Sequence, residues 1–274
     1  MLAVCADDFG LSPAVSRGIA ALAQQGRLNA ISCLSSMPAW PASAPLLAAL
    51  PAEVERGLHF NLSEGEPVSA ELRALWPAMP PLPRLIALAH LRQLPLPAIA
   101  AEWRAQWQCF VAAAGAAPRF VDGHQHVHHL PGVRGIVLQA AADRPGLAVR
   151  STGRVIGPGH ALKRRLIEHT GGRALQRALR AGGIPHNAAL VGAYDFVDPD
   201  YRRCVQRWLA ALPDDGGLLF CHPAAADPGA TTADPIAAAR LREAAYLGSA
   251  AFADDLAAAG VSLGPAWQRR SSAG

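Results

Sequence analysis

The sequence lacks any uninterrupted apolar run that approaches the roughly 20 residues a helix needs to cross a bilayer, so no membrane-spanning helix is expected. The first residues, MLAVCADDF, contain no basic leader, and their apolar part is too short for a signal peptide, so we expect no export. Charge is also scarce: 17% of the residues are charged and 51% are hydrophobic, which excludes a disordered chain and indicates a globular protein with a sizeable core.

Cysteine is sparse and follows no spacing rule. The sequence has five cysteines: Cys5, Cys33, Cys109, Cys204 and Cys221. They form no C-x-x-C pair, and their odd number and irregular spacing argue against a disulfide framework. We expect reduced thiols that pack in the core, which favours a cytoplasmic protein.

Positive charge is concentrated in residues 160–183, whereas the rest of the chain is close to neutral. Six basic residues lie there against the single acid Glu168: Lys163, Arg164, Arg165, Arg173, Arg177 and Arg180. Such a segment is more often a solvated helix face, but it can also contact an anionic membrane peripherally. We expect one of these two roles and no nucleic-acid partner. A homodimer is compatible with the sequence, which does not determine the oligomeric state.

Short apolar segments alternate with helical segments along the chain. The predicted strands lie near 1–7, 30–36, 56–62, 118–124, 146–150, 188–192, 217–222 and 261–263. This alternation builds a parallel sheet, so we predict a single α/β domain over residues 1–266, a distorted, TIM-barrel-like (β/α) barrel. A flexible tail is expected at 267–274. A doubly wound sheet is the alternative, but DDFGLS after the first strand has no glycine-rich phosphate loop.

Capping residues, prolines and glycines mark where the predicted helices begin and end. Ser12 before Pro13 predicts a helix start, and Gly26 predicts its end. Further helices are predicted at 97–115, 173–183, 200–212 and 235–260, the last broken near Gly248. The segment from Ser63 to Pro97 is rich in proline, and we predict a long inserted loop region over one end of the barrel, where lids often lie.

Acidic and histidine residues gather where the predicted strands end. They are Asp7 and Asp8 after the first strand, His59 and Asn61 in the third, Asp122, His124, His126, His128 and His129 in the fourth, and His222 after the seventh. In a parallel barrel these ends form the functional face. Strand alternation places His59 with Asn61 on one face, and Asp122, His124 and His126 on another.

One carboxylate and two imidazoles from separate strands are a common ligand set for a catalytic divalent ion. We predict that Asp8, His59 and His124 bind one such ion, Mg²⁺ or Zn²⁺, with Mn²⁺, Co²⁺ or Ni²⁺ as alternatives. Asn61 and His126 are predicted to contact the substrate. His128 and His129 are expected at the surface or in support of the site.

The adjacent carboxylates of Asp7 and Asp8 should repel each other unless a cation offsets the repulsion. If Asp8 binds the ion, Asp7 remains free to act as a base toward water. The strand must then bend between them, and Gly10 makes a bend inexpensive. His222 is predicted either to be a general acid or to make a hydrogen bond at a strand end.

Four motifs in this order and spacing, ADDFGLSPAV, GLHFNL, DGHQHVHHLP and CHP, resemble the YdjC-like carbohydrate deacetylases. That family includes chitooligosaccharide deacetylases and deacetylases associated with hopanoid lipid synthesis. The resemblance extends to about Leu247. It implies a distorted (β/α) barrel that uses a divalent ion to remove an acetyl group from an N-acetylated sugar, either an N-acetylglucosamine oligosaccharide or a glycolipid such as a glycosylated hopanoid.

Carried over by motif, the resemblance implies metal at Asp8, His59 and His124, with Asp7 as the base. By position it implies that His222 protonates the leaving amine, and that Arg150 in LAVRSTGR orients the base. The segment RLREAAYL, with Arg240 and Glu243, also resembles the family, without a role that the sequence supplies.

Two other functions remain open. A histidine-rich barrel phosphoesterase would also bind metal, but such sites usually open with H-x-H on the first strand and hold two or three ions. This sequence has aspartates there instead. A catalytically inactive carbohydrate-binding barrel is the second alternative, against which the complete set of acid, base and ligands argues.

Overall fold

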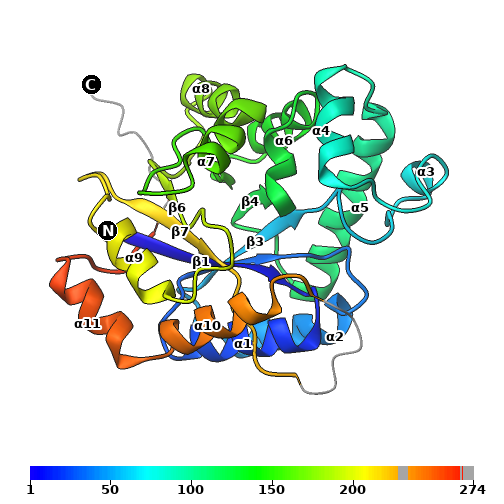
Figure 1. The fold of residues 1–274 in the computed structure, drawn as a ribbon. Coiled ribbons are helices and arrows are strands. Elements are labelled where there is room, and N and C mark those ends of the chain that lie inside the picture. Colours follow the sequence, from blue (N-terminus) through cyan, green and yellow to red (C-terminus); the bar gives the residue numbers. More distant parts are fainter. Residues whose placement is uncertain (228–233, 266, 268–274) are drawn as a thin grey trace.

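The computed structural model describes residues 1–227, 234–265 and 267 (Figure 1). Seven parallel strands form one sheet in the order β5-β4-β3-β2-β1-β7-β6. Their bounds are β1 Leu2–Phe9, β2 Ala30–Cys33, β3 Glu55–Phe60, β4 Phe120–Gly123, β5 Ala148–Val149, β6 Leu190–Val191 and β7 Gly217–Cys221. The sheet curls into a TIM-like half-barrel. The predicted eighth strand is reduced, among the described residues, to an isolated bridge between Leu2 and Leu263.

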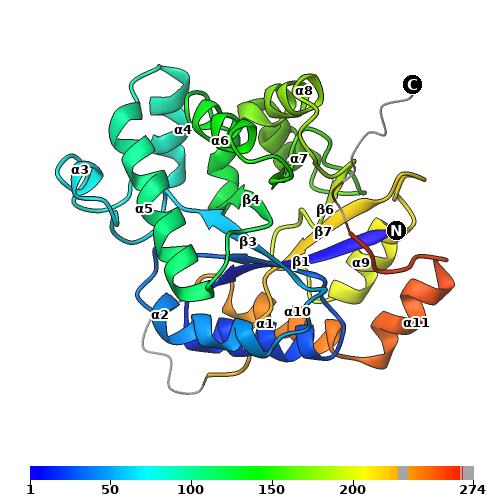
Figure 2. The ribbon, with the colours of Figure 1, turned by 180° about the vertical axis from the view of Figure 1, so that it is seen from behind.

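Helices pack on the outer face of the curled sheet, with α1 and α10 on one side of the molecule and α6, α7 and α8 on the opposite side, as two opposite views agree (Figures 1 and 2). Side chains of α1, α6 and α8 share one apolar core with the same face of the strands. The helices are α1 Pro13–Gln24, α2 Trp40–Ser43, α3 Ala70–Arg73, α4 Leu82–His90, α5 Leu96–Ala114, α6 Val133–Ala142, α7 Ala161–Ile167, α8 Arg173–Ala181, α9 Tyr201–Leu209, α10 Ala237–Leu247 and α11 Ala250–Ala258. Shorter turns are η1 Ala44–Ala49, η2 His124–His129 and η3 Glu168–Gly172. None of the described helices is long and apolar enough to span a membrane.

Local chemistry explains the helix boundaries. The Ser12 hydroxyl accepts a hydrogen bond of 3.2 Å from the backbone N–H of Val15, and Pro13 occupies the first turn, where its missing N–H has no consequence. Gly26 follows the end of α1 with φ +68°, a conformation that favours glycine. The predicted break near Gly248 separates α10 from α11.

Residues 63–97 contain helices as well as irregular chain, so they are not one irregular inserted loop. They contain α3, α4 and the start of α5, and prolines stand at the entrance of α4 and α5, where helices tolerate them. Leu82 and Ile86 of α4 face the central cavity. A lid role for this segment remains a prediction.

The strands near the sheet centre are buried along their length, because helices pack on one face of the curled sheet and a second apolar cluster fills the other. At the end of the described chain, Trp267 packs on Phe120 with ring centroids 4.7 Å apart and donates a hydrogen bond to Glu55. The rest of the predicted tail, 268–274, lies outside the described residues.

Candidate metal centre and active site

The end of β1 presents both aspartates at the carboxyl edge of the sheet. Asp8 has φ +69°, and the register with β2 shifts between Ala6 and Phe9, so the strand bends at Asp8 itself. Aspartate is one of the few side chains that adopt this left-handed region with modest strain. Gly10, with φ +96°, then turns the chain toward α1. The bend lets both carboxylates reach the same cavity, whereas a regular strand would separate them.

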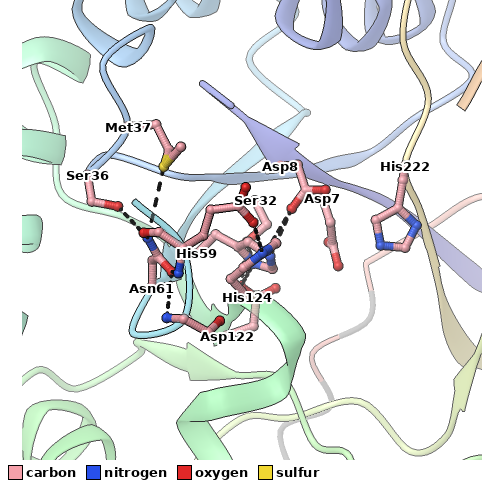
Figure 3. A network of polar contacts seen from close by, with 12 residues as sticks. Asp7, Asp8, Ser32, Ser36, Met37, His59, Asn61, Asp122, His124 and His222 are labelled. Carbon is pink, nitrogen blue, oxygen red and sulfur yellow. Dashed lines mark hydrogen bonds and ion pairs between the residues drawn. The ribbon is translucent and has the colours of Figure 1, made fainter. Parts of the chain in front are cut away.

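Asp8, His59 and His124 converge although they are far apart in the sequence (Figure 3). Oδ1 of Asp8 lies 3.0 Å from Nδ1 of His124 and 3.5 Å from Nε2 of His59. One ligand atom from each of the three lies within 4.8 Å of the others. One carboxylate oxygen and two imidazole nitrogens at this spacing are suited to a divalent ion.

A second carboxylate orients His59 for that role. Nδ1 of His59 lies 2.6 Å from Oδ1 of Asp122, and the hydroxyl of Ser32 also donates to this oxygen. Because an ionised carboxylate only accepts, His59 carries a hydrogen on Nδ1 toward Asp122, and Nε2, which faces Asp8, is the nitrogen that can bind an ion. This arrangement of carboxylate, histidine and ion site is typical of protein metal centres.

The pKa values of Asp8 and His59 show that positive charge is favoured between them. Burial alone would raise the pKa of Asp8, but the Arg240 guanidinium and His124 hold it well below its usual range. Burial alone would lower the pKa of His59, but Asp122 and Asp7 raise it to about 10. A proton therefore occupies the imidazole in the absence of a metal, and a bound cation competes with it.

Arg150, directly after β5, holds Asp7 in place. Its Nη1 and Nη2 each donate a hydrogen bond of 2.6 Å to one oxygen of Asp7, and Nη2 also lies 2.6 Å from Oδ2 of Asp122. The guanidinium is fully buried, so this fork fixes the plane of the Asp7 carboxylate. Asp7 therefore lies next to the group formed by Asp8, His59 and His124 but is not part of it.

Cys5, Asp7 and Asp122 form a second group whose ligand atoms are close enough for an ion. That space already holds a positive charge, because Arg150 contacts both carboxylates and its Nη2 lies 3.1 Å from Sγ of Cys5. Among the described residues, only the Asp8 group therefore combines metal-ligand spacing with a free approach from the cavity.

The prediction that Asp122, His124 and His126 share one face of a strand is wrong. β4 ends at Gly123, and both Gln125 (φ +51°) and His126 (φ +64°) are left-handed, so strand alternation does not reach His126. His126 still lines the cavity, and its Nδ1 is buried without a hydrogen-bond partner in the described part of the protein.

His128 and His129 are buried supports rather than surface groups. Nε2 of His128 lies 2.9 Å from the carbonyl oxygen of Arg150, and His129 lies between the hydroxyls of Thr152 and Thr170. Burial lowers the pKa of both imidazoles, to about 4 for His128. They are therefore neutral near pH 7 and hold the segment after β5 against η2.

His222 follows β7 and reaches the cavity from the side of Asp7 and Asp8 that is opposite His59 and His124 (Figure 3). Its side chain is 13% exposed. Its backbone N–H donates to the buried Glu243, and its Nδ1 lies 3.9 Å from Oε1 of that residue. Tyr194 donates a hydrogen bond of 2.6 Å to the same oxygen. The imidazole is thus held close to a carboxylate while one edge faces the cavity.

The sequence pattern that defines YdjC-like proteins matches residues 1–258. The chain belongs to the YdjC-like family.

Named relatives agree with this membership. A human carbohydrate deacetylase is 36% identical over 145 residues, which cover 51% of this chain and 44% of the relative. A chitooligosaccharide deacetylase of Salmonella typhimurium is 36% identical over 157 residues, 55% of this chain and 58% of the relative. The chain thus spans about half the length of the curated relatives it matches.

A solved structure shares the fold of this YdjC-like protein. The crystal structure of a proposed cellobiose-phosphate cleavage protein from Enterococcus faecalis V583 superposes with a TM-score of 0.75 at 18% identity, covering 96% of both chains. At this identity the likeness concerns the fold alone.

The YdjC-like chain has further site residues that motif reasoning left without a role. Arg240 on α10 donates a hydrogen bond of 2.8 Å to Oδ2 of Asp8 and one of 2.6 Å to Asp234. It therefore fixes the Asp8 oxygen that faces away from the imidazoles. The RLREAAYL motif singled out Arg240 and Glu243, but only the fold shows that they hold Asp8 and His222.

Asn61, predicted to contact substrate, is fully buried and braces a turn instead of lining the cavity. Its Oδ1 accepts hydrogen bonds from the N–H groups of Ser63 and Glu64, and its Nδ2 donates to the carbonyl of Glu64 and the hydroxyl of Ser36. Its contact with substrate stays a prediction. Glu64, which it positions, reaches the cavity and was missed because nothing in GLHFNLSEG marks it as a partner of His124.

A cavity of about 960 Å³ joins these residues. Asp7, Asp8, His59, His124 and His222 contribute polar groups, whereas α4, α7, α10 and their flanking loops contribute apolar walls. The apolar wall residues include Leu82, Ile86, Leu166, Ile167, Phe196 and Ile236. The space combines one charged region with a large apolar surface.

Proposed function

We propose that this YdjC-like protein is a metal-dependent hydrolase that removes the acetyl group from an N-acetylated sugar. One observation carries the proposal: Asp8, His59 and His124 meet within ligand distance, beside the separate carboxylate of Asp7. The names of its relatives, carbohydrate deacetylase and chitooligosaccharide deacetylase, support the same reaction class.

The residues present fit a divalent ion, because both open nitrogens and one carboxylate oxygen point to one place and Asp122 fixes the tautomer of His59. Asp8, His59 and His124 would hold Mg²⁺, Zn²⁺ or a similar ion. When bound, such an ion supplies Lewis acidity that polarises the acetyl carbonyl and makes a water molecule easier to deprotonate.

Asp7 is the proposed base. Its carboxylate lines the cavity, and the two hydrogen bonds from Arg150 keep it from turning toward Asp8. It takes one proton from the water that attacks the acetyl carbon. A base held rigidly in this way is worth about 10²- to 10⁴-fold in rate.

His222 is the proposed acid. As the carbon–nitrogen bond breaks, its imidazolium gives a proton to the departing nitrogen, and the products are acetate and a free amine. Glu243 accepts a hydrogen bond from the backbone N–H of His222, and its Oε1 lies 3.9 Å from Nδ1, so a negative charge stands behind the ring that lines the cavity.

The apolar walls favour a lipid-linked N-acetylglucosamine unit, such as a glycosylated hopanoid, over a soluble chitooligosaccharide. A sugar chain would need polar partners along its length, but the charged groups gather at the metal end, while Leu82, Ile86 and Leu166 line other parts of the wall. His126, with its unpartnered Nδ1 among the described residues, is the proposed partner of a sugar hydroxyl.

Acetate release tests the proposal. Purified protein loaded with Zn²⁺, Mg²⁺ or Mn²⁺ is incubated with N-acetylglucosamine-containing glycolipids and oligosaccharides, and acetate and free amine are quantified together. We expect equal amounts of both products, loss of activity with a chelator, recovery on adding metal, and one ion per chain. Phosphate release from phosphoesters by a protein with two or more ions would instead favour the phosphoesterase alternative, and sugar binding by a loaded protein without turnover would favour an inactive binding barrel.

We also propose that the cavity mouth contacts an anionic membrane. Leu162 and Leu166 on α7 are 83% and 54% exposed, and Leu166 lines the cavity. Arg173, Arg177 and Arg180 on the neighbouring α8 are exposed. An apolar rim beside basic side chains is suited to lipid headgroups and their acyl boundary.

Vesicle binding checks this contact. Each basic residue near an anionic surface contributes about 1 kcal/mol, so reversing Arg173, Arg177 and Arg180 to glutamate is expected to weaken binding to phosphatidylglycerol vesicles at least about 100-fold. A single-reversal control is Arg104→Glu on α5, an exposed arginine away from α8, which should bind as the unmodified protein does, whereas Arg177→Glu alone should already weaken binding. Sedimentation that ignores both salt and the triple reversal would rule out the electrostatic contact.

A further inference from the structure

The side chain of Glu64 stands at the metal end of the cavity on a turn that the fold holds firmly. Fully buried Asn61 accepts hydrogen bonds from the N–H groups of Ser63 at 3.0 Å and Glu64 at 3.1 Å, and donates one of 2.7 Å to the carbonyl of Glu64. Asparagine side chains often stabilise turns in this way. The backbone of Glu64 is therefore fixed, although its side chain is 44% exposed.

The Glu64 carboxylate meets the ring nitrogen of His124 that faces away from Asp8. Oε2 of Glu64 lies 3.1 Å from Nε2 of His124, and Nδ1 of the same ring lies 3.0 Å from Oδ1 of Asp8. A neutral imidazole has one N–H and one lone pair, and an ionised carboxylate can only accept. When a cation takes the place of the proton between Nδ1 and Asp8, the remaining hydrogen belongs on Nε2, toward Glu64.

The two ligand histidines are thus oriented by different carboxylates. Asp122 accepts from Nδ1 of His59 and is completely buried. Glu64 accepts from Nε2 of His124 and lines the open cavity. In both rings the second nitrogen, which loses its hydrogen when a cation binds, faces Oδ1 of Asp8.

We propose that Glu64 is a positioning residue that fixes the tautomer of His124 and so sets the affinity of the Asp8, His59 and His124 site for a divalent ion. The inference rests on the proposed metal-dependent function. Hydrogen-bond partners of ligand histidines typically change metal affinity or activity about 10- to 100-fold when they are removed.

Metal titration without substrate tests the role of Glu64. Chelator competition with Zn²⁺ alone, and the absorption spectrum of bound Co²⁺, are compared for the unmodified protein, Glu64→Ala, Glu64→Gln and Glu66→Gln. We expect Glu64→Ala to weaken Zn²⁺ binding about 10- to 100-fold and to change the Co²⁺ spectrum. Glu64→Gln, whose amide oxygen can still accept from Nε2, should recover part of the affinity.

The exposed Glu66 lies two residues away, so Glu66→Gln changes the same local charge and should leave Zn²⁺ affinity unchanged. Thermal unfolding of the metal-free proteins verifies that each variant is folded. Equal Zn²⁺ affinity and equal Co²⁺ spectra in Glu64→Ala and the unmodified protein would overturn the role of Glu64 alone. Failure of the unmodified protein to bind either metal would overturn the proposed function, and the inference with it.

Discussion

The Asp7→Asn variant is expected to lose about 10²- to 10⁴-fold in the rate of acetate release, because an amide cannot take a proton from the attacking water. Its metal content should stay that of the unmodified protein, since Asp7 lies outside the group formed by Asp8, His59 and His124. Acetate release under metal saturation, with metal analysis of the same sample, measures both quantities.

The matched control for the Asp7 variant is Asp254→Asn, which makes the same change of charge at an exposed position of α11. It should release acetate at the unmodified rate. A fully metal-loaded Asp7→Asn variant with ordinary turnover would reject Asp7 as the base and leave the metal site standing. Loss of metal together with activity would show instead that Asp7 supports the ligands.

The largest effect on stability is expected for Arg150→Gln. Arg150 is fully buried and pairs with the buried carboxylates of Asp7 and Asp122, so its loss leaves two charges without compensation in the interior. Breaking a buried pair in this way costs about 3–5 kcal/mol. Urea unfolding of the metal-free protein measures this loss. Arg150→Lys keeps the positive charge but loses the paired hydrogen bonds of the guanidinium. Its free energy of unfolding should lie between those of Arg150→Gln and the unmodified protein.

Acid sensitivity gives an independent check on the same pair. Burial alone would raise the pKa of Asp122, but Arg150 and His59 lower it from 3.8 to about 2. Because the pKa in the folded state is the lower one, this carboxylate contributes stability above about pH 4, and the contribution disappears as the pH falls toward 2. Without Arg150 the folded-state pKa of Asp122 rises toward its unfolded value, so the contribution becomes smaller and its loss should be complete at a higher pH. Parallel acid-unfolding curves for the two proteins would contradict the assignment.

The convergence of Asp8, His59 and His124 could be predicted from sequence because it depends on two general rules. Parallel strands present their carboxyl ends at one edge, and polar residues at those ends are seldom there for packing. The helix cap at Ser12 and the helix break near Gly248 were also predicted from neighbouring residues alone, and the structure confirms both. Each of these inferences used only neighbouring residues and the alternation of strands with helices.

The features of the site that could not be predicted from the sequence depend on contacts between loops that are distant along the chain. The alternation rule failed at His126 because Gln125 and His126 take left-handed conformations, which strand periodicity cannot foresee. His129 is buried because Thr152 and Thr170, both far along the chain, accept or donate to its ring. The turn that brings Glu64 to His124 likewise depends on buried hydrogen bonds of Asn61.

The left-handed backbone of Asp8 restricts how this lineage can change. Its φ of +69° would strain a β-branched or bulky replacement, whereas glycine and asparagine adopt it readily. A related chain that has lost the proposed hydrolysis is therefore expected to carry glycine or asparagine at this position, and seldom valine, isoleucine or threonine. Glycine or asparagine at this position in a related protein would indicate that the fold is kept while the proposed metal ligand is lost.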